Sequence, residues 1–119
     1  MSEERRRETI LVVDDDGPMR RTLRGLLESR DFGVVDRGSA EDALEALQSL
    51  PVDLVITDLR MPGMKGEALL QEIRGTFPQL PVIAITAFGS VDAALELTRA
   101  GAADYLEKPF RTQRVLDSI

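Results

Sequence analysis

Apolar residues along the chain gather in five short runs, of which the last is interrupted by Asp104. The runs are Ile10–Val13, Phe32–Val35, Asp53–Thr57, Pro81–Ile85 and Ala103–Glu107. Continuous runs rich in β-branched residues are typical of strands that are buried on both faces. The second run is weaker and has charged neighbours, which favours an edge position. The pattern therefore predicts five strands, with the second at an edge of the sheet.

Between these runs, apolar residues recur at helical spacing. Met19, Leu23, Leu26 and Leu27 follow Gly17-Pro18, and proline is favoured at the start of a helix. Ser39 is the predicted N-cap of a second helix, with an inward face of Ala40, Ala43, Leu44 and Leu47. Further helices are predicted at 68–77, after Ser90, and from Arg111 onwards. Strands and helices alternate, which predicts an α/β fold with a doubly wound (βα)5 five-stranded parallel sheet.

Three arginines of the first predicted helix, Arg20, Arg21 and Arg24, fall off its apolar stripe. We interpret them as a solvated face, with docking of a partner as the alternative.

Length and composition narrow the classes of protein to consider. The 119 residues suit one domain, 1–119, with 1–8 as a flexible leader and the chain truncated within the fifth helix. The net charge of −6 argues against direct nucleic acid contact by this domain. With no Cys and no His, thiolate metal sites and the commonest general base are excluded. No apolar run is long enough for a membrane helix, so a cytoplasmic protein with no membrane contact is expected.

Polar residues follow four of the predicted strands directly. Asp14 and Asp15 end the first, Asp58 the third, Thr86 the fourth and Lys108 the fifth. In a flavodoxin-like sheet of strand order 2-1-3-4-5, the first and third strands are neighbours at the topological switch point. Their carboxyl ends would then share one crevice, which brings the three aspartates together. Asp53 opens the third strand, so it would lie at the opposite edge of the sheet.

Three carboxylates in one crevice repel each other unless a positive charge offsets them. Mg²⁺ suits such oxygen ligands, Lys108 supplies a fixed cation, and Thr86 supplies a hydroxyl donor. Together these groups could bind a phosphoryl group and stabilise its transfer to Asp58. Taken singly, each residue could instead be an ordinary polar strand end, Asp16 could be a helix N-cap, and Lys108 could be a surface lysine. The shared position at one edge of the sheet favours the functional interpretation.

Four segments carry a family resemblance: ILVVDDD, VITDLRMPGMKG, ITA and YLEKPF. In this order and spacing they resemble the receiver domain of two-component response regulators over essentially the whole chain. The resemblance implies that Asp58 accepts the phosphoryl group. It further implies that Mg²⁺ is held by Asp15, Asp58 and the backbone carbonyl of Arg60, with Asp14 acting through water. Thr86 and Lys108 would bind the phosphoryl group, and Thr86 and Tyr105 would act as switch residues.

The resemblance also implies a signalling role. A phosphohistidine on a sensor histidine kinase or a histidine phosphotransfer protein would donate to Asp58 in a Mg²⁺-dependent reaction. The surface of the fourth helix, fifth strand and fifth helix would then change, and it could support a homodimer. The segment from Ile85 to Phe110 is most similar to the nitrogen-regulation type, whose members control sigma-54-dependent transcription through further domains. Such a switch catalyses its own phosphorylation but turns over no separate substrate.

Two other classes of protein remain open from the sequence. Asp14-x-Asp16-Gly17 after a strand resembles the signature of haloacid-dehalogenase phosphatases, with Asp14 as nucleophile, although Pro18 starts a helix where those enzymes need an insertion. A binding module that works without phosphorylation is the second alternative, and the complete acid set with Lys108 argues against it.

Overall fold

The computed structural model describes residues 8–58, 66–86, 102 and 104–107. Its elements are β1 (Thr9–Val13), α1 (Gly17–Glu28), β2 (Gly33–Arg37), α2 (Ala40–Ser49), β3 (Leu54–Asp58), α3 (Gly66–Thr76), β4 (Val82–Thr86) and β5 (Asp104–Glu107). The strands pair in parallel in the order β2-β1-β3-β4-β5. This confirms the predicted fold class, strand order and edge position of β2. The predicted fourth and fifth helices lie outside the described residues.

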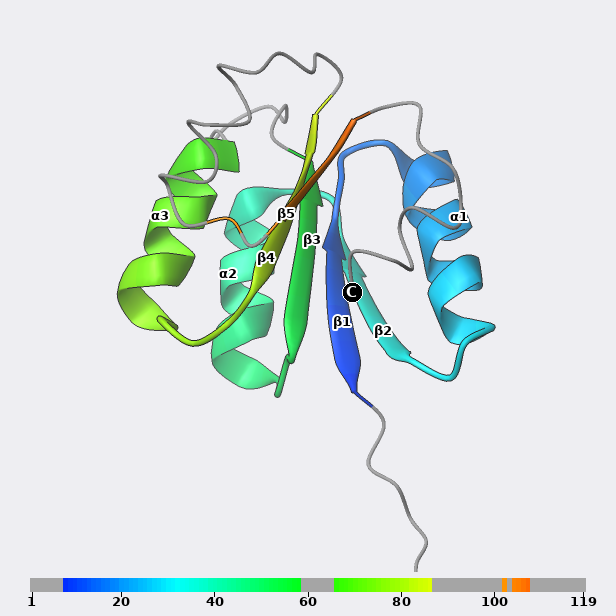
Figure 1. The fold of residues 1–119 in the computed structure, drawn as a ribbon, viewed down its shortest axis with the longest axis horizontal. Helices are drawn as coiled ribbons and strands as arrows, with labels where there is room; N and C mark the ends of the chain where they lie inside the picture. Colours follow the sequence, from blue (N-terminus) through cyan, green and yellow to red (C-terminus); the bar gives the residue numbers. More distant parts are fainter. Residues whose placement is uncertain (1–7, 59–65, 87–101, 103, 108–119) are drawn as a thin grey trace, which may run out of the picture.

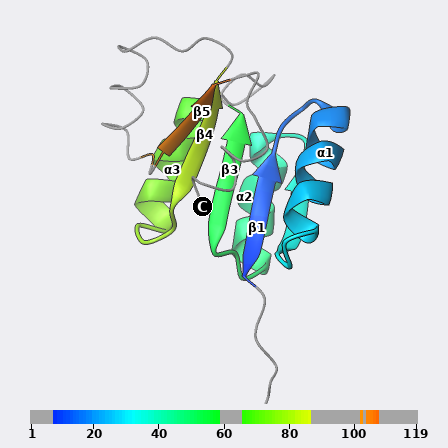
Figure 2. The same cartoon turned by 45° about the vertical axis from the view of Figure 1, so that its right-hand side comes forward.

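The sheet is covered on both faces, as Figures 1 and 2 show, with α1 on one side and α2 and α3 on the other. Successive strand residues point to opposite faces, so β1, β2, β3 and β4 each contribute to two cores. Ile10, Val12 and Ile56 pack with Leu23 and Leu27 of α1. On the other face, α2 and α3 pack against alternate residues of the strands. The strand residues include Leu11, Val13, Val55 and Val82, and the helices contribute Ala43, Leu47, Leu69 and Ile73. Burial on both faces is the reason that β1, β3 and β4 are continuously apolar.

Strand boundaries differ from the predicted ones by a residue or two. The third strand was predicted over Asp53–Thr57, whereas β3 covers Leu54–Asp58. The backbone N–H of Asp53 donates to Thr9 O at 2.8 Å, and its Oδ2 accepts from Thr9 N–H at 2.8 Å. Asp53 is exposed, and this side-chain hydrogen bond joins the starts of β1 and β3.

Local side-chain chemistry sets the helix ends. Asp16 is the N-cap of α1 and accepts from Met19 N–H at 3.2 Å. Ser39 caps α2, as predicted, and accepts from Asp42 N–H at 3.1 Å. After α1, Phe32 N–H donates to Leu27 O and Asp31 N–H to Glu28 O, the paired bonds of a Schellman motif. Asp31 has a φ of 69°, the left-handed conformation this motif needs and which glycine adopts most easily.

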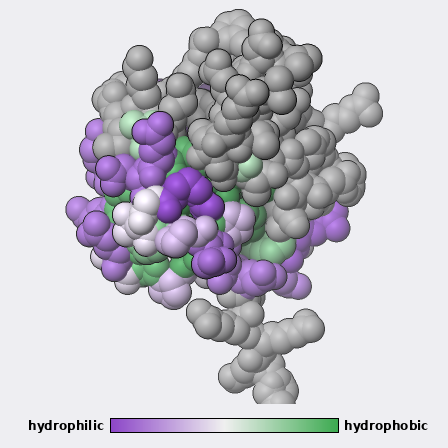
Figure 3. All heavy atoms as spheres, turned by 60° about the vertical axis from the view of Figure 1, so that its left-hand side comes forward, coloured by the Kyte–Doolittle hydropathy of each residue, from purple (hydrophilic) through white to green (hydrophobic). Residues whose placement is uncertain are grey.

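The surface is ordinary for a globular domain in its described part. Figure 3 shows mainly hydrophilic side chains on the α2 and α3 side, with apolar residues visible between them. Among the described residues, Leu50 is the exposed large hydrophobic side chain, at 40% exposure. Within the same residues, no helix is both long and apolar enough to span a membrane.

Candidate functional site

Three carboxylates meet at the carboxyl ends of β1 and β3. Val13 pairs with Thr57 in the sheet, so the next residues, Asp14 and Asp58, follow side by side. One carboxylate oxygen from each of Asp14, Asp15 and Asp58 lies within 4.8 Å of the other two. Asp14 is fully buried, Asp58 is 5% exposed and Asp15 is exposed. The predicted convergence of these aspartates is therefore confirmed, and the cluster is open to solvent at Asp15.

The backbone of Asp14 is held at both of its polar groups. Its N–H donates to Arg37 O at 3.2 Å, which extends the ladder between β1 and β2 by one residue. Its carbonyl oxygen accepts from Nη1 of Arg20 at 2.6 Å. Its side chain is also engaged, because Oδ1 accepts from Asp16 N–H at 2.9 Å. These bonds fix the turn that carries Asp14 and Asp15 toward Asp58.

Arg20 is not a solvated surface residue, so the interpretation of all three α1 arginines as a solvated face is wrong for this one. Besides the carbonyl of Asp14, its Nε lies 3.6 Å from Oδ1 of Asp36, and both side chains are about three-quarters buried, at 25% and 27% exposure. Arg24 donates to the other oxygen of Asp36 at 2.7 Å and to Glu28 at 3.2 Å. Its hydrogen bonds to Asp36 and then Glu28 raise the pKa of Arg24. Arg21 stays exposed, as predicted.

The other predicted site residues divide into two groups. Thr86 is the last residue of β4, and Ile85 before it pairs with Asp58, so the Thr86 backbone lies one step beyond Asp58 on the adjacent strand. Tyr105 lies in β5, where it pairs with Ala84. Arg60 and Lys108 lie outside the described residues. Thr57 was not predicted to contribute; it is buried, and its hydroxyl donates to Asp58 O at 3.0 Å.

The donor set fits a hard divalent cation. Three carboxylates supply only oxygen ligands, which Mg²⁺ prefers, and Mg²⁺ usually takes one or two of them together with waters. An exposed carboxylate beside two buried ones leaves room for such waters. Negative charge this concentrated is also stabilised by a cation, because the carboxylates otherwise repel each other.

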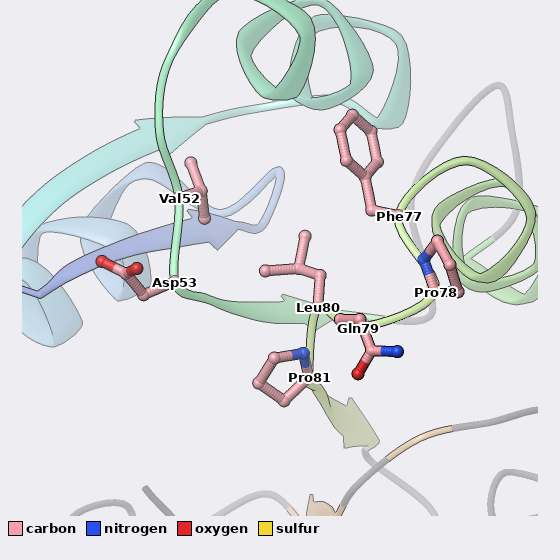
Figure 4. Close-up of a pocket in the computed structure, with 7 residues that line it drawn as sticks. All are labelled: Val52, Asp53, Phe77, Pro78, Gln79, Leu80 and Pro81. Carbon is pink, nitrogen blue, oxygen red and sulfur yellow. The ribbon is translucent and has the colours of Figure 1, made fainter.

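A cavity of about 360 Å³ opens at the other end of the strands. Figure 4 shows its lining, which is Val52, Asp53 and the segment 77–81 between α3 and β4. Asp53 precedes β3 and Pro81 precedes β4, so the cavity lies at the amino ends of these strands. It is therefore separate from the cluster of Asp14, Asp15 and Asp58, and its lining is apolar except for Asp53 and Gln79.

Comparisons with known proteins agree with the fold. The family model for the response regulator receiver domain matches residues 10–119, and the chain belongs to this family. It is 47% identical over 112 residues to the response regulator protein FleR of Pseudomonas aeruginosa, covering 92% of this chain and 23% of FleR. It is 43% identical over 101 residues to the DNA-binding transcriptional regulator NtrC of Escherichia coli K12, covering 85% of this chain and 22% of NtrC.

A solved response regulator receiver protein from Pseudomonas putida superposes with a TM-score of 0.89, at 32% identity, covering 96% of each chain. The predicted family, the receiver domain of two-component response regulators, is thereby confirmed. Family membership also argues against the phosphatase alternative, since residues 10–119 match a receiver domain throughout. The chain spans less than a quarter of FleR and of NtrC.

Proposed function

We propose that this domain is a phosphorylation-dependent switch whose acceptor is Asp58. The observation that carries the proposal is the packing of Asp14, Asp15 and Asp58, with their oxygens within 4.8 Å at the carboxyl edge of the sheet. An oxygen of Asp58 attacks the phosphorus of a phosphohistidine on a sensor histidine kinase or a histidine phosphotransfer protein. The P–O bond forms as the P–N bond breaks, and the electron pair returns to the imidazole nitrogen of the donor.

Each neighbouring residue has a defined task in this reaction. Asp15, Asp58 and the backbone carbonyl of Arg60 hold Mg²⁺, with Asp14 acting through water. Mg²⁺ supplies positive charge that offsets the carboxylates and the charge on the incoming phosphoryl oxygens. Lys108 and Thr86 bind the phosphoryl group. The alignment of Thr86 one residue beyond Asp58 on the adjacent strand supports this placement.

The signal leaves through Thr86 and Tyr105 in this proposal. Thr86 moves toward the phosphoryl group, Tyr105 turns inward, and the surface made by β5 and the two helices predicted after Ser90 and from Arg111 changes. A local anion and its hydrogen bonds thereby bias an element with two states. That surface would bind a second copy of the chain, making a homodimer. Residues 1–119 act as one receiver unit, which turns over no separate substrate and makes no direct nucleic acid contact.

The output of the switch is transcription control through further domains. The similarity to NtrC supports the nitrogen-regulation type, which acts with sigma-54. Since that relative is named a DNA-binding transcriptional regulator and this chain covers 22% of it, DNA binding would belong to parts of the protein beyond this domain. A cytoplasmic location fits such a role.

Intact-mass spectrometry after incubation with acetyl phosphate tests the central step. The wild-type domain should gain the mass of one phosphoryl group with Mg²⁺ and not with EDTA, and peptide mapping should place it on Asp58. Asp58→Asn should remain unlabelled. Asp53→Asn is the matched control, because it changes an aspartate at the opposite end of the same strand. This variant should be labelled normally. A wild-type domain that takes no label would support the phosphorylation-independent binding module, and label on Asp14 would support the phosphatase chemistry.

A further inference from the structure

Arg20 lies between the acidic cluster and the edge strand of the sheet. Its guanidinium group donates to the backbone carbonyl of Asp14 at 2.6 Å while its Nε faces Asp36 at 3.6 Å. Asp14 belongs to the acidic cluster, whereas Asp36 belongs to β2, the strand on the far side of β1. One side chain therefore connects the turn that carries the acids to the edge strand of the sheet.

Both ends of this connection are themselves held in place. Arg24 donates to the second oxygen of Asp36 at 2.7 Å, so the carboxylate that receives Arg20 has a fixed orientation. Gly38, which follows β2, lets the guanidinium lie close to the backbone. A Cβ at position 38 would lie 3.1 Å from Nη1 of Arg20 and 3.7 Å from its Cζ. The guanidinium of Arg20 is thus oriented by Asp36, which Arg24 holds in place, and it fits against Gly38, which has no side chain.

We propose that Arg20 is a positioning residue for the metal and phosphoryl site. It acts through the backbone of Asp14, whose carbonyl it holds, and thereby sets where the Asp14 and Asp15 carboxylates stand relative to Asp58. Outer groups that orient metal ligands have large effects on affinity, since loss of one typically costs tenfold or more. This inference rests on the proposed function, because it concerns the same Mg²⁺ site.

Because Arg20 is charged, the direction in which Arg20→Met changes the Mg²⁺ affinity tests the proposal. Arg20→Met removes a cation near the acidic cluster, which by charge alone would strengthen the binding of a divalent cation. If Arg20 positions the ligands, the same substitution weakens binding. A charge effect and a positioning effect therefore change the affinity in opposite directions.

The experiment is isothermal titration of the purified domain with MgCl₂, together with acetyl phosphate labelling of each variant. Arg20→Met is expected to weaken Mg²⁺ affinity by about tenfold. Arg21→Met is the matched control, because it removes the same charge from the next residue of the same helix, where the side chain is exposed. Its affinity should equal that of the wild type or slightly exceed it. Circular dichroism in EDTA checks that each variant is folded.

Gly38→Ala tests the same role without removing Arg20. Its new methyl group would lie 3.1 Å from Nη1 of Arg20, so the guanidinium must shift by a few tenths of an ångström. That shift would weaken its hydrogen bond to the Asp14 carbonyl, so Mg²⁺ affinity should fall in the same direction as in Arg20→Met, by a smaller factor. In the double variant, Gly38→Ala should add nothing to Arg20→Met, because the group it displaces is already gone. An additive loss would show that position 38 acts by another route and would overturn the proposed link.

The outcomes separate this inference from the function on which it rests. A wild-type domain that takes neither Mg²⁺ nor a phosphoryl group refutes the proposed function, and the role of Arg20 with it. A wild-type domain that takes both, with Arg20→Met binding Mg²⁺ as tightly as Arg21→Met, refutes the role of Arg20 alone.

Discussion

Replacing Asp58 by asparagine should stabilise the domain when no divalent cation is present. The substitution keeps the size and shape of the side chain and removes one negative charge from the acidic cluster. Asp58 is 5% exposed and lies beside the fully buried Asp14, so water screens this pair poorly. In the unfolded chain Asp58 is far from Asp14 and Asp15, so its repulsion with them is a cost of the folded state alone.

The oxygens of the cluster lie within 4.8 Å of each other, which sets the size of the effect. At an effective dielectric constant of about 20, two unit charges at that distance repel by about 3 kcal/mol. Solvent screens the repulsion between Asp58 and the exposed Asp15. Attraction from Lys108, in its proposed position, would offset part of the repulsion between Asp58 and Asp14. The expected gain in the free energy of unfolding is therefore about 1–3 kcal/mol, or a Tm higher by roughly 4–12 °C.

Urea denaturation followed by circular dichroism, in EDTA at low ionic strength, measures this gain. Adding salt should reduce it, because the interaction is electrostatic. Adding Mg²⁺ should narrow or reverse the difference, because the wild type binds the ion through one more carboxylate and gains stability by mass action. Asp53→Asn is again the control; it removes the same charge from an exposed position, and its free energy of unfolding should change by no more than about 0.5 kcal/mol.

Three results would refute this reasoning. Asp58→Asn could be less stable than the wild type in EDTA, which would mean that the carboxylate is a net stabiliser of the fold. The gain could be the same at high salt, which would assign it to packing. Finally, Asp53→Asn could gain as much stability as Asp58→Asn, which would show that the gain comes from the change in net charge and not from the acidic cluster.

Further predictions concern the metal, a strained turn and the core. Millimolar Mg²⁺ should raise the Tm of the wild type in thermal unfolding, because a concentration a hundred times the Kd adds about 2.7 kcal/mol to the free energy of unfolding. Asp15→Ala should abolish this rise in Tm. A rise of equal size in the variant would disprove the ligand assignment. Asp31→Gly should stabilise the domain by about 0.5–1 kcal/mol in urea denaturation, because its φ of 69° suits glycine, whereas Arg30→Gly should not. If the two glycine variants behave alike, the strain at Asp31 is unimportant. Leu27→Ala, at a fully buried position of α1, should cost about 2–5 kcal/mol in the same assay, far more than Leu50→Ala at 40% exposure, and similar losses would contradict the assigned core.

The sequence predicted the architecture well because β1, β3 and β4 are buried on both faces. A short, continuously apolar run such as Leu54–Ile56 is typical of a strand in the middle of such a sheet, and the alternation with helices leaves few topologies. Functional residues of such sheets lie at the carboxyl ends of neighbouring strands, and this alone predicted that Asp14, Asp15 and Asp58 lie close together. The strand ends were less predictable: β3 starts after Asp53 because of its hydrogen bonds with Thr9, which is distant in the sequence.

Arg20 shows where the pattern of the sequence is insufficient. Its place off the apolar stripe of α1 indicates only that it does not join the main core. Its burial depends on Asp36 and Gly38, which come close only after β2 has paired with β1. A helical position alone carries no information on such a contact. The available signal was the combination of an acid and a glycine just after the second run, opposite an arginine of the first helix.

The strand order has a consequence for how the domain acquires its chemistry during folding. Every strand pair is parallel, so each joins segments separated by a crossover, and β1 needs both β2 and β3 as neighbours. Contacts between distant segments form late, because the chain must first lose the entropy of closing the intervening loops. The bonds between Thr9 and Asp53 close a loop of this kind, 44 residues apart. A nascent or partly unfolded chain therefore holds Asp58 apart from Asp14 and Asp15, and the proposed acceptor site can assemble only once β1 and β3 have paired.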